Sequence, residues 1–225
     1  ASGSAGSPRS IAAVCPGSIA AAATAVGSTT GTGATAGSWA RAGPVCGVGA
    51  GLATFFLSEL KIKSTSREVT LKDIDYLNLT ASHTGNTANT GLEYKISDVP
   101  TGEYSALQFG IGVPKALNAK EPKDFSASSI LSSSAEFWSS WKSYIFFRPE
   151  GKIALDGSTV FDTDFALHLG SDDAFSTYDL SKTIKIIDGQ TTNVDITIDM
   201  QKFFNSVTLH DIENTPQIHS LVQLP

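Results

Sequence analysis

From residue 52 onward, hydrophobic and polar residues alternate with a period of two in one short segment after another. The alternation is clear over residues 58–63, 92–97, 105–113, 165–170 and 194–200. Successive side chains of a β-strand point to opposite faces, so this period predicts strands with one buried and one solvated face. Residues 144–147 form an apolar run that Pro149 and Gly151 are expected to end, as in a strand buried on both faces. Together these segments predict an all-β fold, an antiparallel β-sandwich with long loops and at most one or two short helices.

Two segments depart from this period and are candidates for the short helices. Residues 126–141 place Ile130, Phe137, Trp138 and Trp141 at spacings that fit one apolar helical stripe. Residues 201–205 are compatible with a short turn after the last predicted strand. Neither segment changes the all-β class.

Residues 1–51 differ sharply in composition from the rest of the chain. Ala, Gly, Ser and Thr make up 36 of the first 50 residues, and the only charged residues there are Arg9 and Arg41. Three interpretations are open: a disordered linker, a membrane or signal segment, and N-terminal strands with unreliable side-chain identities. The apolar residues 11–26 contain Pro16 and fall short of the roughly 20 residues that span a bilayer. We favour the third interpretation, in which residues 1–225 form a single β-domain and the first 51 carry little weight for chemistry.

The two cysteines, Cys15 and Cys46, both lie in this low-complexity stretch. They are not spaced as CxxC. Either they form one disulfide, which suits an oxidising compartment, or they have no covalent role, and the sequence leaves both readings open.

Charge and motifs exclude several functional classes. The formal net charge is −6, from 16 basic and 22 acidic residues, and the basic residues are spread singly along the chain. This distribution argues against nucleic acid or an anionic membrane as partner. No GxSxG elbow, HExxH motif or Walker loop is present, and no cysteine lies beyond residue 51. We therefore expect a protein that is not an enzyme.

Acidic pairs occur at Asp162 and Asp164 and at Asp172 and Asp173. Calcium prefers oxygen ligands, so a calcium-binding loop is one interpretation of each pair. Without a further partner, solvated loop carboxylates are the interpretation that we favour, and calcium is kept as the weaker alternative.

The informative polar residues are the four histidines, His83, His168, His210 and His219. A single histidine in a strand is more often a packed core or surface residue than a ligand. His168 stands out because it is expected in mid-strand, on the face opposite the apolar residues, between Ala166 and Gly170, whose small side chains leave room for a bound group. His83 lies in a polar loop and has the accessibility that a ligand needs. Two neutral imidazoles with few thiolates suit Cu(II) or Zn(II).

Five ordered segments resemble blocks of the MbnP-like family of secreted bacterial β-proteins. Residues 137–151, FWSSWKSYIFFRPEG, and residues 165–170, FALHLG, resemble the family blocks FWSWxxGYxFxxxEG and FxFHLG. Residues 55–62, 100–113 and 193–204 resemble further blocks in the same order. One departure is the spacing Trp138-x-x-Trp141 in place of Trp-x-Trp, which leaves open which tryptophan corresponds to which. A second departure is Arg41, at a place where some members carry histidine, because a guanidinium offers no lone pair to copper.

The resemblance implies a copper-binding protein of the periplasm or outer cell surface, related in function to copper-repressible surface proteins of methanotrophs. It implies a site of two histidines and a tryptophan oxidised to kynurenine, an oxidation attributed to a dihaem partner of the cytochrome c peroxidase family. Carried over to this chain, His168 and His83 are the candidate copper ligands, and Trp138 or Trp141 is the candidate kynurenine. The alternative for each tryptophan is a core residue packed beside Tyr144.

Two functions are therefore expected from different classes. The first is a non-catalytic copper protein for metal acquisition or copper-linked redox chemistry. The second is a metal-free surface or extracellular-complex module on the same β-sandwich.

Overall fold

The computed structural model describes residues 19–27, 48–49, 51–80, 91–153, 160, 162–198 and 217–218. Within these residues the chain is almost entirely strands: β1 (Ile19–Gly27), β2 (Val48–Gly49), β3 (Ala53–Lys63), β4 (Glu68–Asn78), β5 (Leu92–Val99), β6 (Gly102–Ile111), β7 (Phe137–Trp138), β8 (Ser143–Ile153), β9 (Thr163–Leu167), β10 (Leu169–Gly170), β11 (Ser176–Ile186), β12 (Thr191–Ile198) and β13 (Gln217–Ile218). The described α-helix is α1 (Lys115–Asn118), and short 3₁₀ turns are η3 (Pro122–Asp124), η4 (Ile130–Ser132), η5 (Ser134–Glu136) and η6 (Asp172–Ala174). No helix in this part of the chain is long and apolar enough to cross a bilayer.

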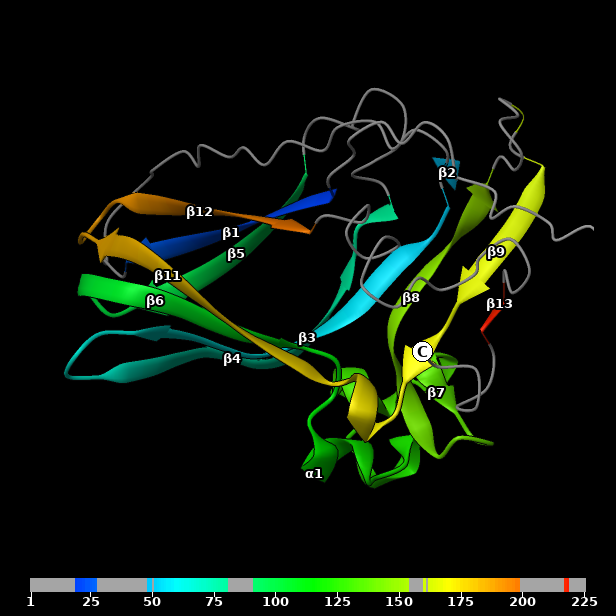
Figure 1. The fold of residues 1–225 in the computed structure, drawn as a ribbon. Coiled ribbons are helices and arrows are strands. Elements are labelled where there is room, and N and C mark those ends of the chain that lie inside the picture. The colour runs from blue at the N-terminus through cyan, green and yellow to red at the C-terminus, as the bar shows by residue number, and fades with distance from the viewer. Residues whose placement is uncertain are drawn as a thin grey trace, which may run out of the picture.

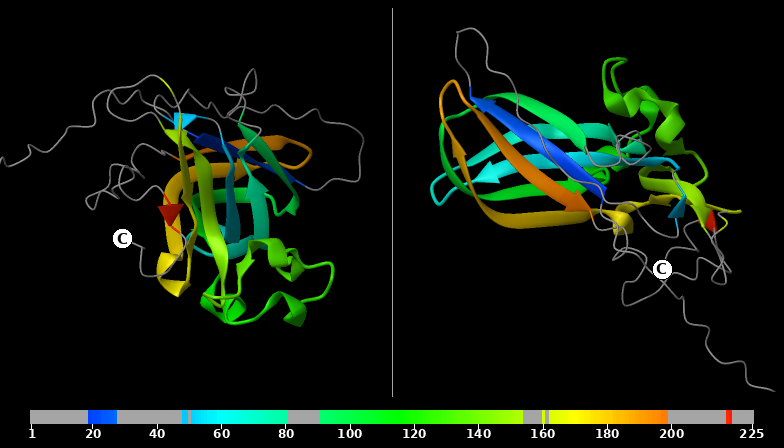
Figure 2. Two further views of the ribbon diagram at one scale, coloured as in Figure 1. Left: turned by 90° about the vertical axis from the view of Figure 1, so that its right-hand side faces the viewer. Right: turned by 90° about the horizontal axis from the view of Figure 1, so that it is seen from above.

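The strands form two sheets. The smaller sheet has the order β12-β1-β5, and the larger has the order β11-β6-β3-β8-β9-β13, with β4 added on β3 and with β2, β7 and β10 added on β8. Neighbours are antiparallel except for β1 with β5 and β13 with β9. In Figure 1 the smaller sheet lies over β4, β3, β6 and β11, while β8 and β9 extend to one side above α1 and the 3₁₀ turns; Figure 2 shows the same arrangement from two further sides. The predicted all-β sandwich is confirmed.

Both faces of β3 are buried, and each faces a different hydrophobic core. Phe55 belongs to the first core, which lies between the two sheets and includes Leu107 of β6 and Val194 of β12. The next residue, Phe56, belongs to a second core with Leu131, Val113, Tyr144 and Phe146. Since neighbouring side chains of a strand point in opposite directions, one strand supplies both cores. The second core is the layer that supports the candidate site.

The predicted helical stripe over residues 126–141 is wrong. This segment forms η4 and η5 and then enters β7. Ser129 Oγ accepts a hydrogen bond from the Leu131 backbone N–H, and Ser133 Oγ accepts one from the Ala135 N–H. Serine side chains that bond to nearby backbone groups compete with the hydrogen bonds of a continuous helix, which explains the short turns. Residues 201–205 lie outside the described residues.

Within the apolar run 144–147, the first three residues are buried as predicted and Phe147 is half-buried, but Pro149 does not end the strand. β8 continues to Ile153, and Pro149 stands opposite Ala53, the first residue of β3. Proline has no N–H to donate, and here it occupies the end of the β3–β8 pairing, where little is lost. The backbone N–H of Glu150 then donates to the Leu52 carbonyl at 2.8 Å. β8 therefore carries Arg148 and Glu150 beyond the position where the sequence predicted a turn.

One hydrogen bond joins the two sheets through polar side chains. The Tyr94 hydroxyl of β5 donates to Asp75 Oδ2 of β4 at 2.7 Å. Asp75 also accepts from the Tyr76 backbone N–H and forms an ion pair with Lys72. Burial raises the pKa of the Asp75 carboxyl, but the hydrogen bonds from Tyr94, Tyr76 and Lys72 outweigh burial and hold this pKa below its ordinary value of 3.8.

Replacing Tyr94 by phenylalanine is expected to lower the free energy of unfolding by about 1–2 kcal/mol at neutral pH, because one charge-assisted hydrogen bond is lost. The folded pKa of Asp75 is lowered, so its contribution is complete above the unfolded pKa and is lost as the pH falls through the folded value. Urea unfolding of both proteins should therefore show a difference that shrinks in acid. Tyr178→Phe, at a tyrosine that is 43% exposed, is the control. A difference that stays constant across the acid range would contradict an ionised Asp75 as the partner.

Candidate functional site

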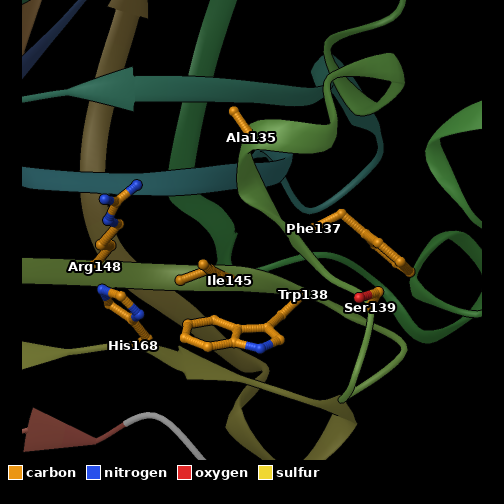
Figure 3. Close-up of a pocket in the computed structure, with 7 residues that line it drawn as sticks. All are labelled: Ala135, Phe137, Trp138, Ser139, Ile145, Arg148 and His168. Carbon is orange, nitrogen blue, oxygen red and sulfur yellow. The ribbon is translucent and has the colours of Figure 1, made fainter.

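A depression of about 330 Å³ lies where β7, β8 and the junction of β9 and β10 meet. The lining residues are Ala135, Phe137, Trp138, Ser139, Ile145, Arg148 and His168. Figure 3 shows the His168 ring and the Trp138 indole along the lower edge of the β8 ribbon, with the Arg148 side chain extending above the ribbon near His168. Two of the sequence-predicted candidates, His168 and Trp138, therefore meet at one site.

His168 lies at a break between two strands and not in mid-strand as predicted. β9 ends at Leu167 and β10 begins at Leu169. Pairing with β8 shifts between Leu169 and Gly170, which marks an irregularity. His168 is only 8% exposed. The imidazole is therefore partly enclosed, and it lies at an irregularity in strand pairing. Such irregularities often turn a side chain toward a functional site.

The register between β8 and β9 explains which charged residues meet His168. Glu150 is paired with Ala166, and Phe147 is paired with Leu169. Between these two pairs, His168 stands opposite Arg148. Arg148 and Glu150 are two residues apart on one strand and so share a face. This register brings both charged side chains of β8 to the imidazole.

These side chains form a continuous chain of four ionisable groups. Arg148 Nη1 lies 3.4 Å from Glu136 Oε1, and Arg148 Nε lies 2.6 Å from Glu150 Oε1. His168 Nε2 lies 2.7 Å from the same Glu150 oxygen. Burial raises the pKa of Glu150, but hydrogen bonds from Arg148 and His168 outweigh it, and the pKa lies below its ordinary value. With a neutral imidazole, two carboxylates and one guanidinium leave a net negative charge, which favours a cation at this position.

Tyr76 packs against the second core and lies near enough to Glu136 to feel its charge. Burial is the main cause that raises the pKa of Tyr76 to about 12, and the negative charge of Glu136 acts in the same direction. Tyr76 packs on Phe56 with ring centroids 4.9 Å apart. Tyr76 is therefore neutral at physiological pH, and Glu136 is held between the core and Arg148.

The two tryptophans are stacked on each other, and only one of them is beside the histidine. Their ring centroids are 4.9 Å apart with an interplanar angle of 10°. The Trp138 ring lies 5.3 Å from the His168 ring. Trp141 instead covers Gly170, where an added Cβ would lie 3.2 Å from the Trp141 ring. The ring contacts select Trp138 as the tryptophan of the site.

The alternative of two core tryptophans does not match the packing. Trp138 and Trp141 are each half-buried. The aromatic residue that packs on Tyr144 from this segment is Phe137, with centroids 5.0 Å apart. The space predicted beside Gly170 is filled by the Tyr144 backbone carbonyl and the Trp141 ring.

Several sequence candidates cannot be placed. His83, His210 and His219 lie outside the described residues, as do the side chains of Cys15, Cys46 and Arg41. Among the residues that are described, no group of three or more His, Cys, Asp or Glu side chains is placed to hold a metal ion. The described donor that lines the depression is the His168 imidazole, and the carboxylates of Glu150 and Glu136 contact the lining residues His168 and Arg148.

The acidic pairs considered for calcium form contacts with nearby side chains. Asp164 forms an ion pair with Lys152 at 2.7 Å. Asp172 forms an ion pair with Lys115 and accepts a hydrogen bond from Asn118 Nδ2. Asp162 Oδ1 accepts from the Thr163 hydroxyl. Calcium binding at these residues stays a prediction.

Sequence reasoning missed three residues of the site, Glu136, Arg148 and Glu150. A usable signal was present for two of them, since Arg148 and Glu150 are opposite charges at strand spacing directly after a buried apolar run. Charged residues that directly follow a buried apolar run on the same strand are expected to lie next to the core. Glu136 carries no comparable signal, because it reaches Arg148 from a separate 3₁₀ turn.

Comparison with known proteins gives one family. The family model MbnP matches residues 48–220. No curated protein matches the chain. Among solved structures, MbnP from Methylosinus trichosporium is similar over 81% of this chain and 71% of that chain, with 12% sequence identity and a TM-score of 0.39.

Proposed function

The chain belongs to the MbnP family, and on that basis we propose that it is a secreted copper-binding protein of the bacterial periplasm or outer cell surface. Its role would be metal acquisition or copper-linked redox chemistry, without catalysis of its own. The proposal continues the expectation drawn from the sequence blocks around Trp138 and His168.

The observation that carries the proposal is the contact between His168 and Trp138 at the depression. The ring of a histidine at the β9–β10 junction and the ring of a tryptophan in β7 lie 5.3 Å apart, beside a cluster that carries a net negative charge when the imidazole is neutral. Imidazole nitrogen is a good ligand for copper, and a carboxylate bonded to the other ring nitrogen is the usual second shell of a metal-binding histidine. The His168 imidazole and the carboxylate bonded to it would therefore supply one ligand of a copper site, together with the group that orients this ligand.

The remaining ligands would come from the rest of the chain and from Trp138 after oxidation. His83 is the first candidate for a second imidazole. Opening the Trp138 indole to kynurenine would supply an aryl amine and a ketone next to His168. A dihaem protein of the cytochrome c peroxidase family is the proposed partner for that oxidation. Copper, when bound, would supply a cationic centre capable of one-electron chemistry beside this ring.

Copper loading of the native protein tests the proposal. After loading and removal of free metal, about one copper per chain is expected, and less than ~0.2 would overturn it. Intact-mass analysis of the native protein tests the proposed oxidation of Trp138, because the conversion of tryptophan to kynurenine changes the mass of the chain. Trp138→Phe should abolish that mass change and Trp141→Phe should retain it. The opposite result would assign the modification to Trp141.

The alternative function is a metal-free surface or extracellular-complex module. It is favoured by the absence of a three-donor cluster among the described residues. A folded native protein that binds no copper and has the mass of its gene product would support this module over the copper protein.

A further inference from the structure

The hydrogen bond at His168 determines more than the position of the ring. A neutral imidazole carries its proton on one nitrogen and a lone pair on the other, and the tautomer decides which nitrogen can bind a metal. His168 Nε2 lies 2.7 Å from Glu150 Oε1. A carboxylate has no proton to donate, so this contact requires the proton on Nε2.

Glu150 is itself held in place from the opposite side. Arg148 Nε lies 2.6 Å from the oxygen that contacts His168, and Arg148 Nη1 reaches Glu136 at 3.4 Å. A guanidinium is planar and holds its partners in a fixed direction. Glu150 is only partly exposed, and its neighbour Pro149 is buried against β3. The carboxylate therefore has little freedom to turn to the other ring nitrogen.

The ring is restrained on its second side by an aromatic contact. The Trp138 indole lies 5.3 Å from the imidazole at an interplanar angle of 56°. Trp141 stacks behind Trp138 and in turn rests on Gly170. A flip of the imidazole would place the Cε1 carbon where Nε2 now lies and so break the bond to Glu150.

We propose that Glu150 is a positioning residue that fixes His168 in the Nε2–H tautomer and so assigns metal binding to Nδ1, with Arg148 holding Glu150 in register. This inference deepens the proposed copper function and rests on it for the role of Nδ1. Its tautomer part concerns the metal-free protein and stands separately. In metal sites, loss of a side chain that hydrogen-bonds to a ligating histidine typically weakens metal affinity by about 10–100-fold.

The test is ¹⁵N NMR of the histidine rings in the metal-free protein, at a pH where the imidazole is neutral. The signals of His168 are assigned by their absence from the spectrum of His168→Gln. Native protein is expected to show a protonated Nε2 and an unprotonated Nδ1. Glu150→Ala should give mixed tautomers, whereas Glu150→Gln, which keeps an acceptor oxygen, should retain most of the native preference.

A matched control is Asp164→Ala, which removes another carboxylate from the same pair of strands, one that is bound to Lys152 and not to His168. This variant should keep the native tautomer and the native copper affinity, while Glu150→Ala should bind copper about 10–100-fold more weakly. A native Nδ1–H tautomer, or an unchanged tautomer in Glu150→Ala, would overturn the inference. If the tautomer responds as expected and no variant binds copper, the copper function fails and the positioning of the ring by Glu150 stands. If Glu150→Ala does not fold, the native spectrum still decides the tautomer, and Arg148→Ala, which frees the Glu150 carboxylate, should give mixed tautomers in its place.

Discussion

His168→Ala is expected to weaken copper binding by more than about 100-fold, because loss of a ligand costs more than the 10–100-fold typical of its second-shell partner. The His168 imidazole is the proposed copper ligand that the structure describes, and its Nε2 is bonded to Glu150. Copper titration of native and variant protein, followed by metal analysis, measures the difference. Retention of native affinity would remove His168 from the site.

Loss of structure must be separated from loss of a ligand in this experiment. His168 is 8% exposed, and its removal leaves Glu150 bonded to Arg148 alone. The expected cost in free energy of unfolding is about 1–3 kcal/mol. His168→Gln keeps most of the side-chain volume and should lose copper to a similar extent while remaining folded. His219→Ala, at a histidine outside the proposed ligand set, is the matched control and should bind copper normally.

Phe56→Ala should lower the free energy of unfolding by about 3–5 kcal/mol, because it opens a cavity in the second core. Phe56 is 1% exposed and packs on Tyr76 and Tyr144, at 4.9 Å and 5.7 Å between ring centroids. Urea unfolding of native and variant protein measures the change. Tyr178→Ala, at an exposed tyrosine, should cost only about 1 kcal/mol, the value of its stacking on Phe109.

A second comparison tests whether this core supports the site. Phe55→Ala removes the same side chain from the first core and should cost a similar amount. Phe56 contacts Tyr144, which contacts Phe137, the neighbour of Trp138. Tryptophan fluorescence of the folded protein should therefore change in Phe56→Ala and stay native in Phe55→Ala. Equal spectra for the two variants would show that the second core does not position the tryptophans.

The period-two pattern predicted the strands that bury one face and missed those that do not. β5 and β12 alternate between buried or half-buried and exposed positions, in agreement with their sequences. β11 is exposed at its first eight positions, and β4 has a single buried residue. Both strands are joined to the sheet through backbone hydrogen bonds to one neighbour, so their side chains need no apolar alternation. The hydrophobic alternation of a segment therefore predicts which of its residues are buried, but it does not predict whether an exposed segment pairs at the edge of a sheet.

By itself the sequence determined the all-β class, the family and the two residue types, histidine and tryptophan, that define the candidate site. These properties follow from local periodicity and ordered motifs, which are read along the chain. The tertiary structure alone decided that Trp138 and not Trp141 lies beside His168, and that Glu136, Arg148 and Glu150 form the charged chain leading to it. The reason is strand register: a shift of one residue between β8 and β9 would turn every side chain to the other face. The sequence gives the residue types of the candidate site, but which of these residues contact one another depends on the pairing of segments that are far apart along the chain.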